Sequence, residues 1–307
     1  MDVKDVRIFC EIAFRDLSYN ATTQRHVSPT EIGGKLGLSE KTVRARITNM
    51  EEDGFIKYYQ ALPSLSLFGL GFITLYRFEA LNIATKKKLM WAAHEIPKIV
   101  EAVDYIGPTV SIDIAGQAPE EIQTVADNIA GRFELKKFKL GTRTVRDSGF
   151  RMDRLDWQLV QKLRYDARMT TADLAKDLGV TPRMAEYRLD KMLDSGALLI
   201  RAVIDTQKQA GLIFYEMELS VDEKKRGGVI EKLRQLNGEK IYSVSSPSSG
   251  LVLASMFGFN LGEPEDSASA SSEIEGVKYC QLLILKEFVE PRRSNWVDRS
   301  ISEKLDA

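Results

Sequence analysis

The sequence has 307 residues, of which 44% are hydrophobic and 28% are charged, and its formal net charge at pH 7 is -1. This composition is that of an ordinary globular protein and excludes extensive disorder, while the length exceeds the ~150 residues of a typical domain. The balanced charge excludes a uniformly basic nucleic-acid binder, so a nucleic-acid site would have to depend on local charge.

Three further features set expectations for location and redox state. The longest apolar stretch, residues 65–76, is shorter than the ~18 residues that indicate a membrane-spanning helix. The first residues place acids within their apolar pattern, unlike a secretory signal. Cys10 and Cys280 lie far apart and show no metal-like spacing. We therefore expect a cytoplasmic protein with reduced cysteines and no disulfide.

In chain order, the first predicted element is an amphipathic helix, because Val6, Phe9, Ala13 and Leu17 recur at helical spacing. The polar residues 18–27 end this helix.

A pair of helices joined by a tight turn follows. Ser28, Pro29 and Glu31 form a capping-box signature for a short helix that Gly37 ends. Ser39 can cap a third helix over residues 40–53, with its polar and basic side chains outward, which is the helix-turn-helix pattern. Residues 55–61 then predict two brief β segments, a small wing.

Residues 39–56 recur in weaker form 142 positions later, as residues 181–198. In this register Arg46 matches Arg188 and Met50 matches Met192. An internal repeat of this kind predicts that the second half copies the plan of the first. The three helices of the second copy are expected around residues 155–163, 170–178 and 182–195, and its wing at residues 198–204.

Each three-helix unit is followed by segments with strand character and two helices. In the first half the predicted strands are residues 71–79, a strand ending at 106, 110–114 and 138–146, with helices at 84–95 and 119–132. In the second half they are 212–221, 241–244, 251–257 and 277–288, with helices at 229–236 and, weakly, 267–274. The order βαββαβ predicts a ferredoxin-like sheet with both helices on one face.

Three stretches lie outside this repeated plan or are ambiguous within it. Residues 263–272 are loop-like in composition, and we expect poor order there. Lys86, Lys87 and Lys88 indicate a solvated helix start. Residues 291–307 combine two arginines with apolar residues at helical spacing. We expect this tail to pack on the body of the protein, and the alternatives are exchange to a partner chain and contact with DNA.

A winged helix-turn-helix followed by a βαββαβ domain resembles the leucine-responsive regulator/AsnC (Lrp/AsnC) family of transcription factors, here in two tandem copies. The resemblance is most specific in residues 36–56, LGLSEKTVRARITNMEEDGFI, and the second copy departs from it more. The fold class expected is therefore α+β, with two winged helix-turn-helix domains alternating with two ferredoxin-like domains for ligand binding and dimerisation. The predicted domains are residues 1–62 and 150–206 (winged helix-turn-helix), 63–149 and 207–290 (ferredoxin-like), and 291–307 (tail).

The resemblance, together with outward polar and basic residues, implies that the third helix of each copy contacts the major groove of double-stranded DNA. For Arg46 the alternatives are base readout, a phosphate contact or a brace within the fold. The candidate DNA-binding residues are Ser39, Lys41, Thr42, Arg44, Ala45, Arg46, Asn49, Thr181, Arg183, Tyr187, Arg188 and Lys191.

The resemblance also implies a small-molecule effector site at the loop between the two central strands of each sheet domain. The residues that match by position are Gly107, Pro108, Thr109, Ser248, Ser249 and Gly250. We expect no catalytic residue, metal or cofactor, because nucleotide and nucleophile motifs are absent and His26 and His94 are isolated.

The sequence therefore predicts a DNA-binding transcriptional regulator, not an enzyme, that forms a homodimer or higher homo-oligomer and does not bind membranes. The sheet domains are expected to pair within one chain or between chains. One alternative is an enzyme similar to siroheme decarboxylases, which resemble this architecture and would place histidines in the sheet domains. The other is an architectural or partner-binding protein.

Overall fold

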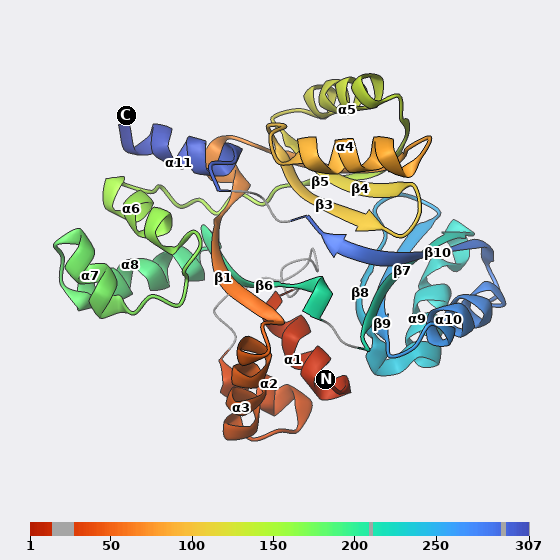
Figure 1. Ribbon diagram of the computed structural model, residues 1–307, viewed down its shortest axis with the longest axis horizontal. Helices are drawn as coiled ribbons and strands as arrows, with labels where there is room; N and C mark the ends of the chain where they lie inside the picture. The colour runs from red at the N-terminus through yellow and green to blue at the C-terminus, as the bar shows by residue number, and fades with distance from the viewer. Residues whose placement is uncertain (14–27, 209–210, 290–292, 307) are drawn as a thin grey trace. The chain divides into compact units, whose positions relative to one another are not determined.

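The computed structural model describes residues 1–13, 28–208, 211–289 and 293–306 (Figure 1). The chain forms two compact units. The sheet unit comprises residues 72–144 and 209–292 together with Met1–Val3, and the helix-turn-helix unit comprises Lys4–Gly71, Val145–Lys208 and Arg293–Ala307. Each unit thus contains both copies of one kind of domain, which confirms the predicted α+β fold class and the tandem repeat.

The helix-turn-helix unit contains the two predicted three-helix copies. The first consists of α1 (Val3–Ala13), α2 (Pro29–Leu36) and α3 (Glu40–Glu52), and the second of α6 (Arg154–Leu163), α7 (Thr171–Leu178) and α8 (Pro182–Asp194). Leu17 and the polar segment predicted to end the first helix lie outside the described residues.

The turns between these helices follow the predicted caps. Ser28 Oγ accepts a hydrogen bond from the Glu31 N–H at 3.2 Å, and Glu31 accepts one from the Ser28 N–H at 3.1 Å, so the capping box is confirmed. Gly37 and Gly179 end α2 and α7 with φ of 64° and 67°, a left-handed conformation that favours glycine. The equivalent glycines give both copies the same tight turn before the third helix.

The predicted wing is wrong in its detail. Residues 56–63 form one strand, β1 (Ile56–Pro63), and not two brief segments. β1 pairs antiparallel with β6 (Leu198–Ile204) of the second copy, with Tyr59 opposite Ala202 and Leu62 opposite Leu199. A lone strand leaves its backbone groups unpaired, and each copy here satisfies that need with the strand of the other.

The sheet unit holds one sheet of strand order β5-β2-β4-β3-β10-β7-β9-β8. The first half contains β2 (Phe72–Glu79), α4 (Ile83–Ala93), β3 (Ile99–Tyr105), β4 (Thr109–Gly116), α5 (Pro119–Phe133) and β5 (Lys136–Thr144). The second half contains β7 (Ile213–Val221), α9 (Arg226–Asn237), β8 (Ile241–Ser245), β9 (Leu251–Gly258), α10 (Gly262–Ser272) and β10 (Val277–Phe288). The two halves are joined where the end of β10 pairs with β3.

Each half buries one face of its strands beneath its own helices. In the first half Tyr76 and Phe78 of β2 pack with Leu89 of α4 and Ile122 of α5. In the second half Met217 and Leu219 of β7 take the same role against α9. The intervening residues of β2 and β7 therefore point to the opposite, inner face.

Arg77 of β2 joins the two inner faces. Its Nη2 lies 2.7 Å from Glu216 Oε1 and 2.8 Å from Glu218 Oε2, both on β7, and its Nη1 donates to Ser111 on β4. The Arg77 side chain is only 5% exposed. The two halves also approach closely at Gly141, where a Cβ would lie 2.0 Å from the Pro247 carbonyl oxygen. The sheet domains therefore pair within the chain, one of the two arrangements that the sequence left open.

Two local expectations in the sheet unit are wrong. The acidic and serine-rich segment expected to be poorly ordered forms α10, with Pro264 and Ser271 buried, so tertiary packing outweighs its weak helical composition. Of the three lysines expected to be solvated, Lys87 and Lys88 are exposed but Lys86 is buried. The Lys86 Nζ lies 2.6 Å from Asp104 Oδ1 and donates to the Tyr105 carbonyl at 2.6 Å.

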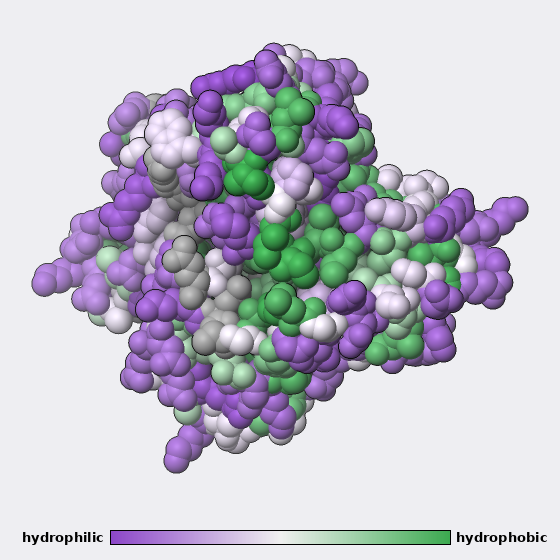
Figure 2. All heavy atoms as spheres, turned by 45° about the vertical axis from the view of Figure 1, so that its right-hand side comes forward, coloured by the Kyte–Doolittle hydropathy of each residue, from purple (hydrophilic) through white to green (hydrophobic). Residues whose placement is uncertain are grey.

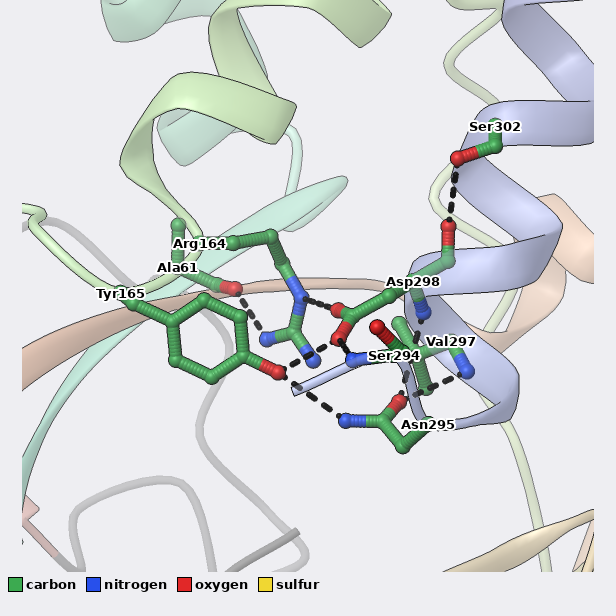
Figure 3. A network of polar contacts seen from close by, with 8 residues as sticks. All are labelled: Ala61, Arg164, Tyr165, Ser294, Asn295, Val297, Asp298 and Ser302. Carbon is green, nitrogen blue, oxygen red and sulfur yellow. Dashed lines mark hydrogen bonds and ion pairs between the residues drawn. The ribbon is translucent and has the colours of Figure 1, made fainter. Parts of the chain in front are cut away.

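The tail forms the predicted helix, α11 (Trp296–Asp306), which packs on α6 and buries Ile301 in the core of the second helix-turn-helix copy. A polar network fixes its first turn (Figure 3). Asp298 accepts hydrogen bonds from Arg164 Nε at 2.9 Å and from the Tyr165 hydroxyl at 2.6 Å, and Arg164 Nη1 also donates to the Ala61 carbonyl of β1. Arg164 thereby ties α11 to both copies.

The exterior combines hydrophilic and hydrophobic areas. Figure 2 shows hydrophilic and hydrophobic residues exposed together on one face. Among the helices that the structure describes, none combines the length and the apolar character that crossing a bilayer requires.

Candidate nucleic-acid interface

The outer face of α3 carries most of the residues predicted to contact DNA. Lys41, Arg44, Ala45 and Asn49 are exposed along it. The Arg44 side chain is 63% exposed, and its Nε lies 2.8 Å from Glu40 Oε1, one turn earlier in the helix. The hydrogen bond from Arg44 is the largest cause, and that from Thr30 the second, of a Glu40 pKa below its usual value. This surface offers two cations, an amide and a small side chain, a suitable set for phosphates and base edges.

Ser39 and Thr42 have a structural task at the start of α3. The Ser39 Oγ accepts a hydrogen bond from the Thr42 N–H at 3.1 Å and lies 2.8 Å from the Thr42 hydroxyl. Ser39 is thus the N-cap residue, and Thr42 is half-buried beside it. These two residues therefore order the first turn of the helix.

Arg46 points to α1. Its Nη1 lies 2.6 Å from Asp5 Oδ1, and the two side chains are 27% and 17% exposed. This contact favours the bracing alternative for Arg46 over base readout. It also orients α3 on the first helix of the copy.

Arg188 repeats this arrangement in α8. Its Nη1 lies 2.7 Å from Asp153 Oδ2 and 2.8 Å from Asp156 Oδ1, both at the start of α6. The hydrogen bonds to Asp156 and Asp153 raise the pKa of Arg188 above its ordinary value. The matching arginines of the repeat therefore serve the same purpose, which is to fix the third helix to the first.

The outer face of α8 is chemically mixed. Arg183, Tyr187 and Lys191 are exposed as predicted, and Lys191 Nζ lies 4.4 Å from the centroid of the Tyr187 ring. Glu186 and Asp190 are exposed on the same helix. Thr181 accepts a hydrogen bond from the Met184 N–H at 3.2 Å and caps α8, as Ser39 caps α3.

Sequence reasoning missed two exposed residues of these faces and the partners of both arginines. Thr48 of α3 and Met184 of α8 lie outward beside the predicted residues. The acidic partners belong to a repeated sequence pattern, Asp-x-x-Asp, which occurs at residues 2–5 and again at 153–156. Aligning the two copies with one fixed offset does not match these two occurrences. Asp5 precedes Arg46 by 41 positions, whereas Asp156 precedes Arg188 by 32, so a fixed offset of 142 misaligns the first helices.

The loops predicted to hold an effector lie between β3 and β4 and between β8 and β9, as expected. In the first loop Gly107 has φ 95° and its carbonyl accepts a hydrogen bond from Lys86, while Pro108 is exposed and Thr109 is buried at the start of β4. The contact with Lys86 joins this loop to α4. The effector prediction itself stays a prediction.

The second effector loop already holds a carboxylate of the chain. Glu223 accepts hydrogen bonds from the Gly250 N–H at 2.7 Å and the Ser249 hydroxyl at 3.1 Å, and Ser248 is exposed beside them. The Gly250 N–H is the largest cause of the lowered pKa of Glu223. The donors of this loop that would suit an anionic ligand are thus occupied by the chain itself.

Family models match both helix-turn-helix copies. A model described as a winged helix-turn-helix DNA-binding domain matches residues 24–57, and one described as an AsnC-type helix-turn-helix domain matches residues 152–193. The AsnC-type match thus falls on the second copy, although the sequence comparison placed the stronger resemblance in the first. The second match includes the first helix of its copy, whereas the match to the first copy begins after α1.

Comparison with known proteins gives one curated relative and two full-length structural likenesses. The chain is 34% identical over 110 residues to the proline dehydrogenase transcriptional activator of Rhodobacter capsulatus, covering 33% of this chain and 71% of the relative. Two crystal structures of the siroheme decarboxylase NirDL, one of them in co-complex with an iron-uroporphyrin III analogue, match this chain at 15% identity with TM-scores of 0.55 and 0.54. Both matches cover 99% of this chain and 98% of the NirDL chain. At this identity the structural likeness shows the fold.

Two helix-turn-helix copies with capped third helices, alternating along the chain with two ferredoxin-like halves that pair with each other, define a tandem winged helix-turn-helix protein. With the match to the AsnC-type model and to the curated relative, the chain belongs to the Lrp/AsnC family.

Proposed function

We propose that this protein is a sequence-specific DNA-binding transcriptional regulator of Lrp/AsnC type, with α3 as its principal DNA-contacting helix. The observation that carries the proposal is the outer face of α3, where Lys41, Arg44 and Asn49 are exposed while Arg46 holds the helix on α1. The curated relative, which is a transcriptional activator by name, supports the same class of function.

In this proposal α3 enters a major groove, with Lys41 at a phosphate and Arg44 and Asn49 at base edges. The second helix, α8, enters a neighbouring groove, although Glu186 and Asp190 weaken its attraction to phosphate. The sheet unit assembles the chain, and a small effector acting there would modulate binding. No catalytic step is part of the proposal.

The test is selection of bound sequences from a random pool of DNA duplexes, with the purified full chain as bait. We expect enrichment of a defined sequence, and loss of that enrichment in the Lys41→Ala/Arg44→Ala variant. Equal recovery of all sequences by the wild-type chain would contradict sequence-specific binding and favour the architectural alternative.

A second candidate function is tetrapyrrole decarboxylation, because the full-length likeness to NirDL covers nearly the whole of both chains. Among the described residues of the sheet unit the one histidine is His94, which follows α4 at its C-terminal end. The inner face also carries Glu216 and Glu218, two carboxylates that share the single cation Arg77. The remaining negative charge would repel the carboxylates of a tetrapyrrole. These features favour the regulator.

An absorbance titration with siroheme separates the two candidates. The regulator proposal expects no saturable spectral change and no decarboxylated product under anaerobic turnover conditions. Tight binding with product formation would replace the proposal by the enzymatic one.

A further inference from the structure

The two recognition helices keep the same inner residues and differ on the outside. In the repeat register, Arg46 and Met50 of α3 match Arg188 and Met192 of α8, and both arginines make the same brace. The outer positions Thr42, Arg44, Ala45, Thr48 and Asn49 of α3 correspond to Met184, Glu186, Tyr187, Asp190 and Lys191 of α8. The two helices thus share the residues that pack inward and differ in the side chains that they expose.

The face of α3 is suited to hydrogen-bonded readout of purines. An arginine can pair bidentately with guanine and an asparagine with adenine, and Arg44 and Asn49 are both exposed. Ala45 between them leaves room for a close approach to the base edges.

The face of α8 is suited to a different base sequence. Met184 and Tyr187 are 45% and 57% exposed, large apolar groups that match the methyl of thymine. Glu186 stands where α3 has Arg44, and a carboxylate accepts from the amino group of cytosine but repels the acceptors of guanine. A half-site that satisfies α3 therefore leaves α8 with unpaired or opposed groups.

Both helices belong to one unit and are joined by contacts between the copies. β1 and β6 pair along seven positions, and Arg168, just before α7, bonds the Tyr59 hydroxyl at 2.8 Å and also contacts Glu51 at the end of α3. An ordinary symmetric dimer presents two identical helices and so reads two identical half-sites. This chain presents two different ones.

We propose that the DNA site of this protein is asymmetric, with one half-site read by α3 and an unlike half-site read by α8, so that the chain binds in a single direction. The inference rests on the proposed function. It assigns readout to Arg44 and Asn49 in the first half-site and to Met184, Glu186 and Tyr187 in the second.

Selection from random duplexes with the wild-type chain is the first test. We expect two dissimilar half-sites whose centres lie about one helical turn, ~34 Å, or a multiple of it apart. A palindromic consensus would overturn the inference and leave the proposed function standing. Failure to enrich any sequence would overturn the proposed function.

A matched pair of helix-exchange variants is the second test. The first gives α8 the outer face of α3 through Met184→Thr, Glu186→Arg, Tyr187→Ala, Asp190→Thr and Lys191→Asn, leaving Ala185, Arg188 and Met192 in place. We expect this variant to select a palindrome made of two copies of the α3 half-site. Retention of the wild-type consensus in a folded variant would overturn the inference.

The reciprocal variant gives α3 the outer face of α8 through Thr42→Met, Arg44→Glu, Ala45→Tyr, Thr48→Asp and Asn49→Lys. It is expected to favour two copies of the other half-site. We expect both variants to fold, because the exchanged positions lie outside the buried core. Circular dichroism and urea unfolding check this.

Discussion

Arg44 and Arg46 lie two positions apart on α3 and have opposite surroundings. Arg44 is largely exposed, whereas Arg46 is turned toward Asp5 at 2.6 Å. A hydrogen bond to a charged group contributes roughly 1.5–3 kcal/mol when its partner is well ordered. The same residue type is therefore exposed for the proposed DNA contact at one position and braces the fold at the other.

Arg46→Met is expected to lower the free energy of unfolding by about 1–2 kcal/mol, because the ion pair with Asp5 is lost while the partial exposure of the two side chains limits the cost. Urea denaturation measures this change. Arg44→Met is the matched control and should leave the unfolding midpoint unchanged. Equal stability of the two variants would mean that Arg46 is not a brace.

Arg44→Met is expected to weaken binding to the selected DNA by about 1–3 kcal/mol, the usual contribution of a specific base contact. Fluorescence anisotropy at fixed salt concentration measures the affinity, because phosphate contacts make binding depend on salt. The Glu52→Gln variant, also on an exposed position of α3, is the control for unspecific charge effects. Undiminished affinity would exclude Arg44 from the interface.

At the scale of elements, the contact between β2 and β7 fixes which sheet faces pair. In the strand register Arg77 of the first copy corresponds to Glu218 of the second, so equivalent positions carry opposite charges and form an ion pair. Two identical halves would bring like charges together at this position. The inner face of each half is therefore complementary in charge to that of the other half, and not to a second copy of itself.

Arg77→Met is expected to destabilise the chain by about 3–5 kcal/mol, because it leaves Glu216 and Glu218 without their partner in a buried interface. Thermal or urea unfolding measures the loss. The triple variant Arg77→Met/Glu216→Gln/Glu218→Gln should recover most of the stability. A triple variant as unstable as the single one would show that packing, and not the unpaired charges, causes the loss.

The packing of the C-terminal helix α11 can also be tested. Ile301→Ala is expected to cost about 2–5 kcal/mol, since Ile301 is 1% exposed within the core of the second helix-turn-helix copy. Glu303→Ala, on an exposed position of the same helix, should change stability by less than about 0.5 kcal/mol. Equal midpoints for the two variants would indicate that α11 does not stay docked in solution.

For the whole molecule, the pairing of both kinds of domain within one chain sets the expected assembly. Cysteines placed at Leu62 and Leu199, which are opposite each other on β1 and β6, should form a disulfide inside one chain in a Cys10→Ser/Cys280→Ser background. Non-reducing electrophoresis and mass determination should then show a cross-linked product of one-chain mass. A covalent dimer would mean that the strands pair between chains.

The homo-oligomer expected from the sequence stays a prediction. Since the two sheet halves already pair with each other through Arg77 and the β10–β3 contact, association of further copies would have to use another surface. Sedimentation of the full chain over a range of concentrations measures the state.

Most of the fold could be predicted because the helix caps and the strand patterns of the first half recur in the second half. Caps such as Ser28 and the glycines at 37 and 179 identified the helix boundaries, and the βαββαβ order identified the sheets. The partners of β1 and β6 could not be predicted, because an isolated apolar strand does not indicate which distant strand completes it. α10 was predicted only weakly and in part, at residues 267–274, because its serines and acids gain their order from packing.

The candidate site was predicted less well than the fold. Exposure along α3 follows from helical periodicity, so Lys41, Arg44 and Asn49 were found. The direction of Arg46 and Arg188 depends on acids 32 or more positions away, and the repeated Asp-x-x-Asp pattern that contains these acids is not aligned by the single register of the repeat. The same holds for Lys86, whose partner Asp104 lies on another element.

The interleaving of the two units has a consequence for synthesis on the ribosome. β1 finds its partner only when β6 has emerged, and the core of the second helix-turn-helix copy waits for Ile301, close to the end of the chain. At the ~5–20 residues per second of translation, the first copy spends on the order of ten seconds or more with an unpaired strand. Nascent chains should thus depend on holding chaperones until α11 has emerged, and messages truncated before α11 should yield proteolysed rather than partly active protein.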